Sequence, residues 1–137
     1  MSRDLFTNAK DIIELKLIND YVALDNAKGD TNLQLINERF QNRDGLILFY
    51  SPKCGWCKKM APAWQELSGI VKDKFRVAAV NCMDSKGGND LLADYFRVSG
   101  YPTIKYYKDG KYTDYTGGRS TQELLNYLCK VNGLCNF

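Results

Sequence analysis

Residues 46–57 read Leu46-Ile47-Leu48-Phe49-Tyr50-Ser51-Pro52-Lys53-Cys54-Gly55-Trp56-Cys57. The first five form an unbroken apolar run, which is typical of a strand buried on both faces of a sheet. The residues after the second cysteine, 58–64, are typical of a helix. We therefore predict a strand that leads directly into a helix, with the first cysteine on the exposed opening turn of that helix.

The pair Cys54 and Cys57 predicts thiol–disulfide exchange. Two cysteines separated by two residues can close a small disulfide and reopen it when another thiol attacks. Free N–H groups and the helix dipole can lower the pKa of a cysteine at a helix N-terminus from about 8.5 into the range of roughly 3.5 to 7.5. Cys54 is therefore the predicted nucleophile, and Cys57, one helical turn inward, is the predicted resolving thiol. This chemistry needs no bound cofactor.

Length and composition exclude several other classes of protein. The 137 residues suffice for one compact domain with a sizeable core. The net charge of +3 comes from scattered lysines and arginines, so neither nucleic acid nor an anionic membrane is an expected partner. The chain has no histidine, which excludes Ser-His-Asp triads, Cys-His dyads and histidine-containing zinc sites.

The sequence also bears on where the protein works. No window reaches the apolar length of a membrane span, and residues 1–10 lack the apolar stretch of a secretory signal. We therefore expect a cytoplasmic protein. The alternative is a protein of a secretory compartment from which a signal has been removed.

The remaining cysteines are not expected to react with substrates. Cys82 ends a predicted buried strand and should behave as a small apolar residue. Cys129 and Cys135 flank a helix end, where we expect two free thiols in a reducing compartment, with a local disulfide as the alternative. A zinc site that joins them to Cys54 and Cys57 has the wrong spacing, so no metal is predicted.

The period of the apolar residues predicts the element order β-α-β-α-β-α-β-β-α, with no internal repeat. Ile13, Leu15 and Leu17 alternate like a first strand, although residues 12–24 also fit a helix. The later strands are predicted near 46–50, 75–82, 103–107 and 111–115. The helices are predicted near 31–40, 54–71, 89–96 and 120–131, the second with a kink at Pro62.

Several residues mark helix ends and turns. Asp30 or Thr31 is expected to cap the first helix, which buries Leu33, Ile36 and Phe40. Asn89 or Asp90 is expected to cap the third helix, which has Leu91, Leu92, Tyr95 and Phe96 on its apolar face. Asp109-Gly110 is a hairpin signal. Ser120 to Glu123 is a capping box, and the last helix it opens is expected to stop near Gly133.

Three segments together resemble proteins of the thioredoxin fold, and in particular the catalytic domains of protein disulfide isomerase. Residues 49–62 are similar to the active-site segment of that family, 100–105 to its cis-proline segment and 117–119 to its last loop. The resemblance implies an α/β thioredoxin fold, in which a central mixed β-sheet is flanked by helices on both faces. Residues 31–137 would form the thioredoxin-like domain, and 1–30 an N-terminal extension that includes the candidate first strand.

The resemblance also implies which residues surround the two thiols. It places Tyr101 and Pro102 opposite the cysteines, with a cis bond before the proline that leaves the preceding backbone free to pair with an extended substrate. Arg119 matches an arginine that is thought to promote ionisation of the second cysteine. The substrate groove is expected to be lined by Gly55, Trp56, Tyr101, Pro102 and Gly117.

Two positions depart from the family pattern. Thioredoxins and disulfide isomerases usually carry a buried acid six positions before the first cysteine, where this chain has Leu48. A leucine avoids the cost of a buried charge but leaves Cys57 harder to deprotonate. At Trp56, isomerases have histidine and thioredoxins proline; the indole ring cannot stabilise a thiolate by charge but can pack against a substrate.

The predicted partners are cysteine-containing protein substrates and a redox partner that recycles the site, and the chain is expected to be a monomer. One alternative is a binding module that keeps the fold but scarcely turns over, as Leu48 suggests. Another is a glutaredoxin-like enzyme that uses glutathione, which the absence of Pro-Tyr between the cysteines disfavours. Similar proteins are encoded by some large DNA viruses, and the lysine- and asparagine-rich composition suits such an origin, with the virion as a further location.

Overall fold

Strands and helices alternate along the chain in the predicted order. The computed structural model describes residues 4–16 and 31–137. Its elements are β1 (Ile12–Glu14), α2 (Thr31–Arg39), β2 (Gly45–Tyr50), α3 (Gly55–Val71), β3 (Arg76–Asn81), α4 (Asn89–Tyr95), β4 (Thr103–Lys108), β5 (Lys111–Tyr115) and α5 (Thr121–Asn132). Within this part of the chain, no helix is long and apolar enough to cross a membrane.

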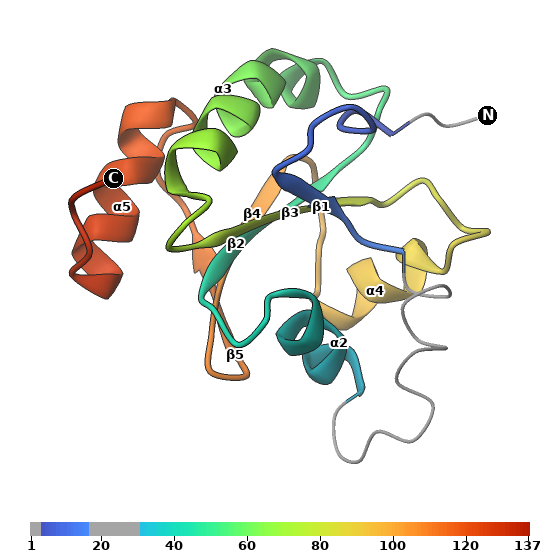
Figure 1. Cartoon of the computed structure of the whole chain (residues 1–137). Helices are drawn as coiled ribbons and strands as arrows, with labels where there is room; N and C mark the ends of the chain where they lie inside the picture. The colour runs from blue at the N-terminus through green and yellow to red at the C-terminus, as the bar shows by residue number, and fades with distance from the viewer. Residues whose placement is uncertain (1–3, 17–30) are drawn as a thin grey trace.

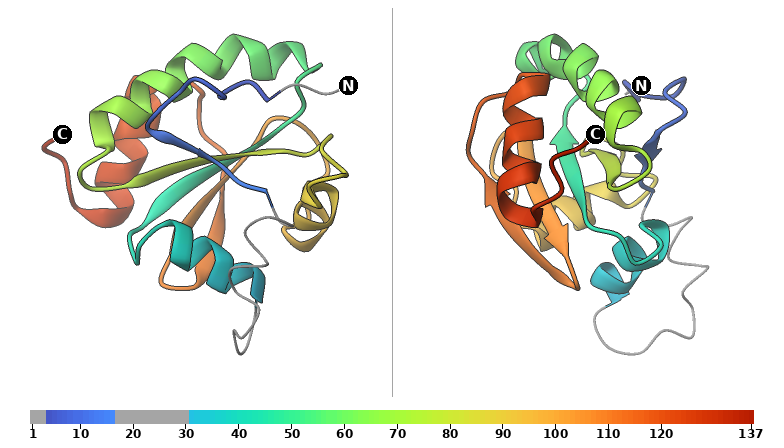
Figure 2. Two further views of the ribbon diagram at one scale, coloured as in Figure 1. Left: turned by 45° about the vertical axis from the view of Figure 1, so that its right-hand side comes forward. Right: turned by 60° about the vertical axis from the view of Figure 1, so that its left-hand side comes forward.

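The strands form one mixed sheet in the order β1-β3-β2-β4-β5. The pairs β1–β3 and β3–β2 are parallel, whereas β4 runs antiparallel to both β2 and β5. Helices α3 and α5 cover one face of the sheet, and α2 and α4 cover the other (Figures 1 and 2). The predicted thioredoxin fold, with a mixed sheet between two helical layers, is therefore confirmed.

Two apolar clusters fill the space between the sheet and its helices. Every residue of β2 is buried, as predicted for a strand covered on both sides. The first cluster lies under α3 and α5 and includes the predicted helix residues Met60, Trp64, Leu67, Val71, Leu124 and Leu128. The second lies under α2 and α4 and includes Leu35, Ile36, Phe40, Leu92 and Phe96. Because β2 contributes to both clusters, the segment that leads into the cysteine pair is anchored from both faces.

The predictions for α2 and for the first strand are tested only in part. Ile36 and Phe40 are buried as predicted. Asp30, Leu17 and the side chains of residues 31–33 lie outside the described part of the structure, so the cap and the inward position of Leu33 are not tested. Residues 12–14 form a strand rather than the start of a helix.

The cap predicted for α4 is wrong. The helix begins after Gly88, which has a left-handed φ of 79°, and no side chain caps it. Asn89 instead lies inside the helix, fully buried, where its Nδ2 donates to the carbonyl oxygens of Leu15 at 2.9 Å and Asn81 at 3.2 Å. Leu91 is 62% exposed and does not belong to the apolar face. Asn89 therefore links the start of α4 to the ends of β1 and β3. One of its two partners, Leu15, lies far away in sequence.

The hairpin and the last helix follow their local signals. Asp109 and Gly110 have φ angles of 51° and 79°, which allow a tight two-residue turn between β4 and β5. The Ser120 hydroxyl accepts a hydrogen bond from the Glu123 N–H at 3.2 Å, which caps α5 as predicted. The helix ends at Gly133 in a left-handed conformation.

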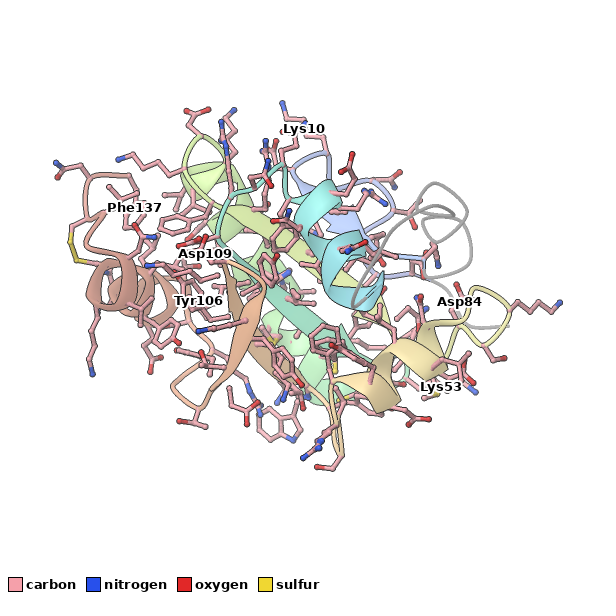
Figure 3. The ribbon with its side chains drawn as sticks, turned by 90° about the horizontal axis from the view of Figure 1, so that it is seen from below. Lys10, Lys53, Asp84, Tyr106, Asp109 and Phe137 are labelled. Carbon is pink, nitrogen blue, oxygen red and sulfur yellow. A yellow bond between two sulfur atoms is a disulfide. The ribbon has the colours of Figure 1, made fainter. Side chains whose placement is uncertain are left out.

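Cys129 and Cys135 form a disulfide at the end of α5, so the expectation of two free thiols is wrong (Figure 3, yellow bond beside the C-terminal helix). The cause is local geometry. Gly133 turns the chain back on the last helical turn and leaves the two Cα atoms 4.6 Å apart, within the range of about 4.4 to 6.8 Å that a disulfide requires. Cys82 is a buried free cysteine in the second cluster, as expected.

Removing this disulfide should destabilise the protein modestly. The bond closes a loop of cysteines six positions apart, and a short loop restricts the unfolded chain by about 2 kcal/mol. We expect the double variant Cys129→Ser/Cys135→Ser to lose about that much free energy of unfolding in a urea titration, with unchanged spectra of the folded state. The exposed neighbour Asn136→Ser serves as the control. An unchanged urea midpoint in the double variant would contradict a stabilising role for the bond.

Candidate active site

Cys54 sits where β2 ends and α3 begins, as the sequence predicts. It is the N-cap residue of α3, with the extended backbone (φ −79°, ψ 120°) typical of that position. Its Sγ accepts a hydrogen bond from the Cys57 N–H at 3.4 Å and is partly exposed. The buried strand and the first turn of α3 together hold this sulfur at the surface with backbone donors directed toward it.

The surroundings of Cys54 favour its thiolate. Partial burial alone would raise its pKa. That effect is outweighed by hydrogen bonds from the Cys57 thiol and from the N–H groups of Cys57 and Trp56, together with the positive charge of Arg119, so the pKa lies below its ordinary value. Cys54 is thus both accessible and inclined to ionise.

Cys57 has the opposite environment. Its side chain is fully buried in the cluster under α3. Burial raises its pKa to about 12, and the hydrogen bond and negative charge of the neighbouring Cys54 sulfur add to the rise, against smaller opposing effects of the Ser51 backbone and Arg119. Two adjacent thiols therefore differ in both access and acidity. The outer one can attack a disulfide at a pH where the inner one still holds its proton.

Tyr101 and Pro102 face the outer thiol. The peptide bond between them is cis. The Cys54 thiol donates to the Tyr101 carbonyl oxygen at 3.7 Å, although 47 residues separate the two in sequence. Pro102, Gly117 and Arg119 contribute to the lining of a pocket of about 310 Å³ on the Pro102 side of the site. The structure thus brings the segment before β4 and the loop before α5 to the cysteines.

Trp56 and the same loop form a second pocket, of about 530 Å³. The Trp56 ring is 62% exposed. Lys59 Nζ lies 4.6 Å from its centroid, and Arg119 Cζ lies 5.9 Å from it. Gly55 is exposed at the start of α3. The structure thus gathers the residues that the sequence predicts for the site: the two cysteines, Gly55 and Trp56 between them, Tyr101 and Pro102 opposite Cys54, and Gly117 and Arg119 in the loop that lines both pockets.

Comparison with known proteins agrees with this fold. The family model described as Thioredoxin matches residues 26–130. The chain belongs to the thioredoxin family. The matched range contains the cysteine pair, the cis-proline segment and the loop with Arg119.

This thioredoxin-family chain is similar to parts of longer proteins. It is 36% identical over 121 residues to protein disulfide-isomerase A4 of Homo sapiens, which covers 88% of this chain and 18% of that protein. It is 40% identical over 91 residues to protein disulfide-isomerase 1 of Caenorhabditis elegans, which covers 64% of this chain and 18% of the relative. The chain therefore spans about a fifth of these relatives.

Solved structures show the same likeness. The first thioredoxin domain of mouse protein disulfide-isomerase A4 is 32% identical, with a TM-score of 0.60 over 79% of this chain and 73% of that one. The J-Trx1 fragment of ERdj5 superposes with a TM-score of 0.70 over 95% of this chain and 56% of the fragment, at 23% identity, which supports the fold alone.

The sheet carries a partly buried acid, Glu14, on a different strand from the one that the resemblance suggests. Leu48 is fully buried in the cluster that contains Cys57. In the register of the sheet, Leu48 pairs with Ala79, and Ala79 pairs with Glu14 of β1. Glu14 Oε1 accepts hydrogen bonds from Tyr50 Oη at 2.8 Å and from the Phe6 N–H at 3.2 Å. Its Oε2 is buried and has no hydrogen-bond partner among the described residues.

The environment of Glu14 disfavours its charged form. Burial raises its pKa to about 7, and nearby Asp4 adds to the rise, while hydrogen bonds from Tyr50 and Phe6 and the charge of Lys16 oppose it. Sequence reasoning missed this residue because Ile13 and Leu15 alternate around it, which predicts an outward polar side chain. Burial of Ile12 and Phe6 shows that β1 is covered on the Glu14 face as well. Ile12 and Ile13, two consecutive apolar residues, were the sequence signal that both faces of this strand are covered.

Glu14 should make stability fall as the pH rises from about 5 to 8. The unfolded carboxyl loses its proton near its ordinary pKa of about 4.3, whereas the folded one keeps it until about 7. Between these values the folded state binds more protons, so the free energy of unfolding decreases with pH and levels off above 7. After a discount for partial exposure, we expect a loss of about 2 kcal/mol.

Urea unfolding of the Glu14→Gln variant at pH 5 and pH 8 tests this prediction. The chain has no histidine that titrates in this range, and closing the Cys54–Cys57 disulfide removes the ionisation of Cys54. The variant should lose less than a quarter of the amount that the parent loses between the two pH values, whereas the exposed control Glu66→Gln should behave like the parent. The same pH dependence in Glu14→Gln would show that another group causes it.

Proposed function

We propose that the chain is a thiol–disulfide oxidoreductase that exchanges disulfides with protein substrates through Cys54 and Cys57, without a bound cofactor. The observation that carries this proposal is the contrast between the two sulfurs. Cys54 is accessible with a lowered pKa, and Cys57 is buried with a raised one. Similarity to proteins named protein disulfide-isomerase supports the same reaction class.

In the proposed reduction, the Cys54 thiolate attacks one sulfur of a substrate disulfide. A bond forms between Cys54 and that sulfur, and the other substrate sulfur leaves as a thiolate. Cys57 then gives up its proton and attacks the Cys54 sulfur. The Cys54–Cys57 disulfide forms. The substrate sulfur that had been bonded to Cys54 leaves and is protonated. The protein loses two electrons and the substrate gains them; the reverse sequence donates the disulfide.

The other site residues have supporting roles in this proposal. The backbone at Tyr101 lies beside the reacting sulfur and can pair with an extended substrate segment. Gly55, Trp56, Pro102 and Gly117 form the walls of the groove that receives this segment. Arg119 acts through its charge, which lowers the pKa of both thiols and so helps Cys57 to ionise after the mixed disulfide has formed.

The proposed partners are cysteine-containing proteins and a separate redox partner that resets the pair, with the chain acting as a monomer. Residues 31–137 are the proposed thioredoxin-like unit, and the segment 1–30 is an extension that adds β1 to the sheet. The Cys129–Cys135 disulfide favours an oxidising compartment over the cytoplasm as the working location, because disulfides of this kind persist where thiols are not kept reduced.

Insulin reduction by dithiothreitol, with and without the protein, tests the proposal. We expect the protein at micromolar concentration to accelerate the reduction at least about tenfold, and to reactivate scrambled ribonuclease in a glutathione buffer. No acceleration in either assay would refute the oxidoreductase and favour the binding module. Acceleration that requires glutathione as the reductant would favour the glutaredoxin-like alternative.

A further inference from the structure

The pocket beside Trp56 is lined by two cations and no acid. Its walls come from the first three turns of α3 and from the loop before α5, namely Trp56, Lys59, Met60, Ala63, Gly117, Gly118, Arg119 and Ser120. Lys59 and Arg119 both lie over the exposed Trp56 ring. The ring and the two cations therefore form one surface next to Cys54, to which we refer as the Trp56 surface.

The charges of the Trp56 surface are not neutralised within the described part of the chain. No acidic side chain there forms an ion pair with Lys59 or Arg119. Glu123 lies close to this loop, where its Oε1 accepts a hydrogen bond from the Ser120 hydroxyl at 2.7 Å as part of the helix cap, but it forms no ion pair with either cation. Two positive side chains are thus held against an aromatic ring, with their donors available to a ligand.

Positive charge continues around the reacting thiol. The pocket on the Pro102 side contains Arg97 and Arg119, and its acid, Asp114, is already paired with the Lys105 ammonium group. Lys53 and Lys58 are exposed immediately beside the cysteines. A client that approaches Cys54 therefore meets a cationic face on both sides of the groove.

Resting on the proposed oxidoreductase function, we propose that the Trp56 surface binds acidic side chains next to the client's reacting cysteine. The preferred substrates are protein disulfides flanked by Asp or Glu. A carboxylate can accept hydrogen bonds from the guanidinium and ammonium groups while the client backbone packs along the Trp56 ring. Charge complementarity of this kind accelerates encounter and selects among partners, and it weakens with salt.

Single-turnover reduction of matched peptides tests the proposal. Three five-residue peptides carry Glu, Gln or Lys on both sides of one cysteine, which is capped by a neutral 2-hydroxyethyl thiol in disulfide linkage. The reduced protein supplies two electrons and two protons and becomes the Cys54–Cys57 disulfide, and each capped peptide leaves as two thiols. Chromatography of the released peptide gives the rate constant.

At low salt we expect the Glu peptide to react about fivefold faster than the Gln peptide, and the Lys peptide to react more slowly than either. In 1 M salt the three rates should converge. Lys59→Gln should reduce the Glu-to-Gln ratio by half or more, and Lys59→Glu should bring it below one. Because each ratio is taken within one variant, a change in Cys54 reactivity cancels. Lys72→Gln, at the far end of α3, removes the same charge and should keep the parent ratio.

Equal rates for the Glu and Gln peptides in the parent, or a ratio that Lys59→Glu leaves unchanged, would overturn the acidic-client proposal while leaving the oxidoreductase proposal intact. Failure to reduce any of the three peptides, with Cys54 still reactive toward iodoacetamide, would instead refute the proposed function and this inference together.

Discussion

We expect the variant Cys57→Ser to accumulate a mixed disulfide with its client, and Cys54→Ser to form none. Without the buried thiol, the bond between Cys54 and the client has no nearby sulfur to displace it. Without Cys54, the remaining thiol is fully buried, and burial, the largest cause of its raised pKa, is unchanged. We expect both variants to lose at least about a thousandfold in turnover of insulin. Non-reducing electrophoresis and intact mass measure the adduct.

The pH dependence of alkylation provides the matching measurement. Cys54 in the reduced protein should react with iodoacetamide with a midpoint below that of a free cysteine, about 8.5, because its pKa is lowered. Cys57, followed in Cys54→Ser, should react far more slowly than Cys54, because its side chain is fully buried and burial keeps its pKa raised. Cys82→Ser is the control, since Cys82 is buried and its pKa is also raised to about 12. The assigned roles would be contradicted if alkylation of Cys54 had the pH midpoint of a free cysteine, or if the mixed disulfide with the client formed at Cys82.

The cysteine site could be predicted because its causes are local. A buried apolar run forms the strand, and the next residues form a helix, so the first cysteine must fall at the helix N-terminus. The same holds for the Asp109-Gly110 turn and for the Ser120 cap. In each case the interacting groups lie within a few residues of one another, where spacing alone determines geometry.

Features that depend on distant contacts were missed. Asn89 resembles a helix cap in sequence, but its amide bonds to carbonyl groups 74 and 8 residues away. Glu14 resembles a surface residue, but Tyr50 and Phe6 enclose its carboxylate. No periodicity distinguishes these outcomes, because each one is decided by which segments pack together.

Leu48→Glu should lower the stability of the protein and accelerate the release of its client. The side chain lies fully buried in the cluster with Cys57, so a carboxylate there loses its hydration, and we expect the free energy of unfolding to fall by about 3 kcal/mol. The same carboxylate can accept the Cys57 proton, which burial otherwise holds with a pKa of about 12. Release of a trapped client should therefore accelerate, measured as the decay of the mixed disulfide after rapid mixing.

Leu48→Gln separates the two effects of this substitution. It places a polar group of similar size on β2 without a proton acceptor of useful basicity, so it should destabilise the fold without accelerating release. Glu14 is on the same row of the sheet, with Ala79 between the two positions, so a second carboxylate should raise the pKa of both acids by charge repulsion. If Leu48→Glu releases the client no faster than Leu48→Gln, proton transfer from Cys57 does not limit release.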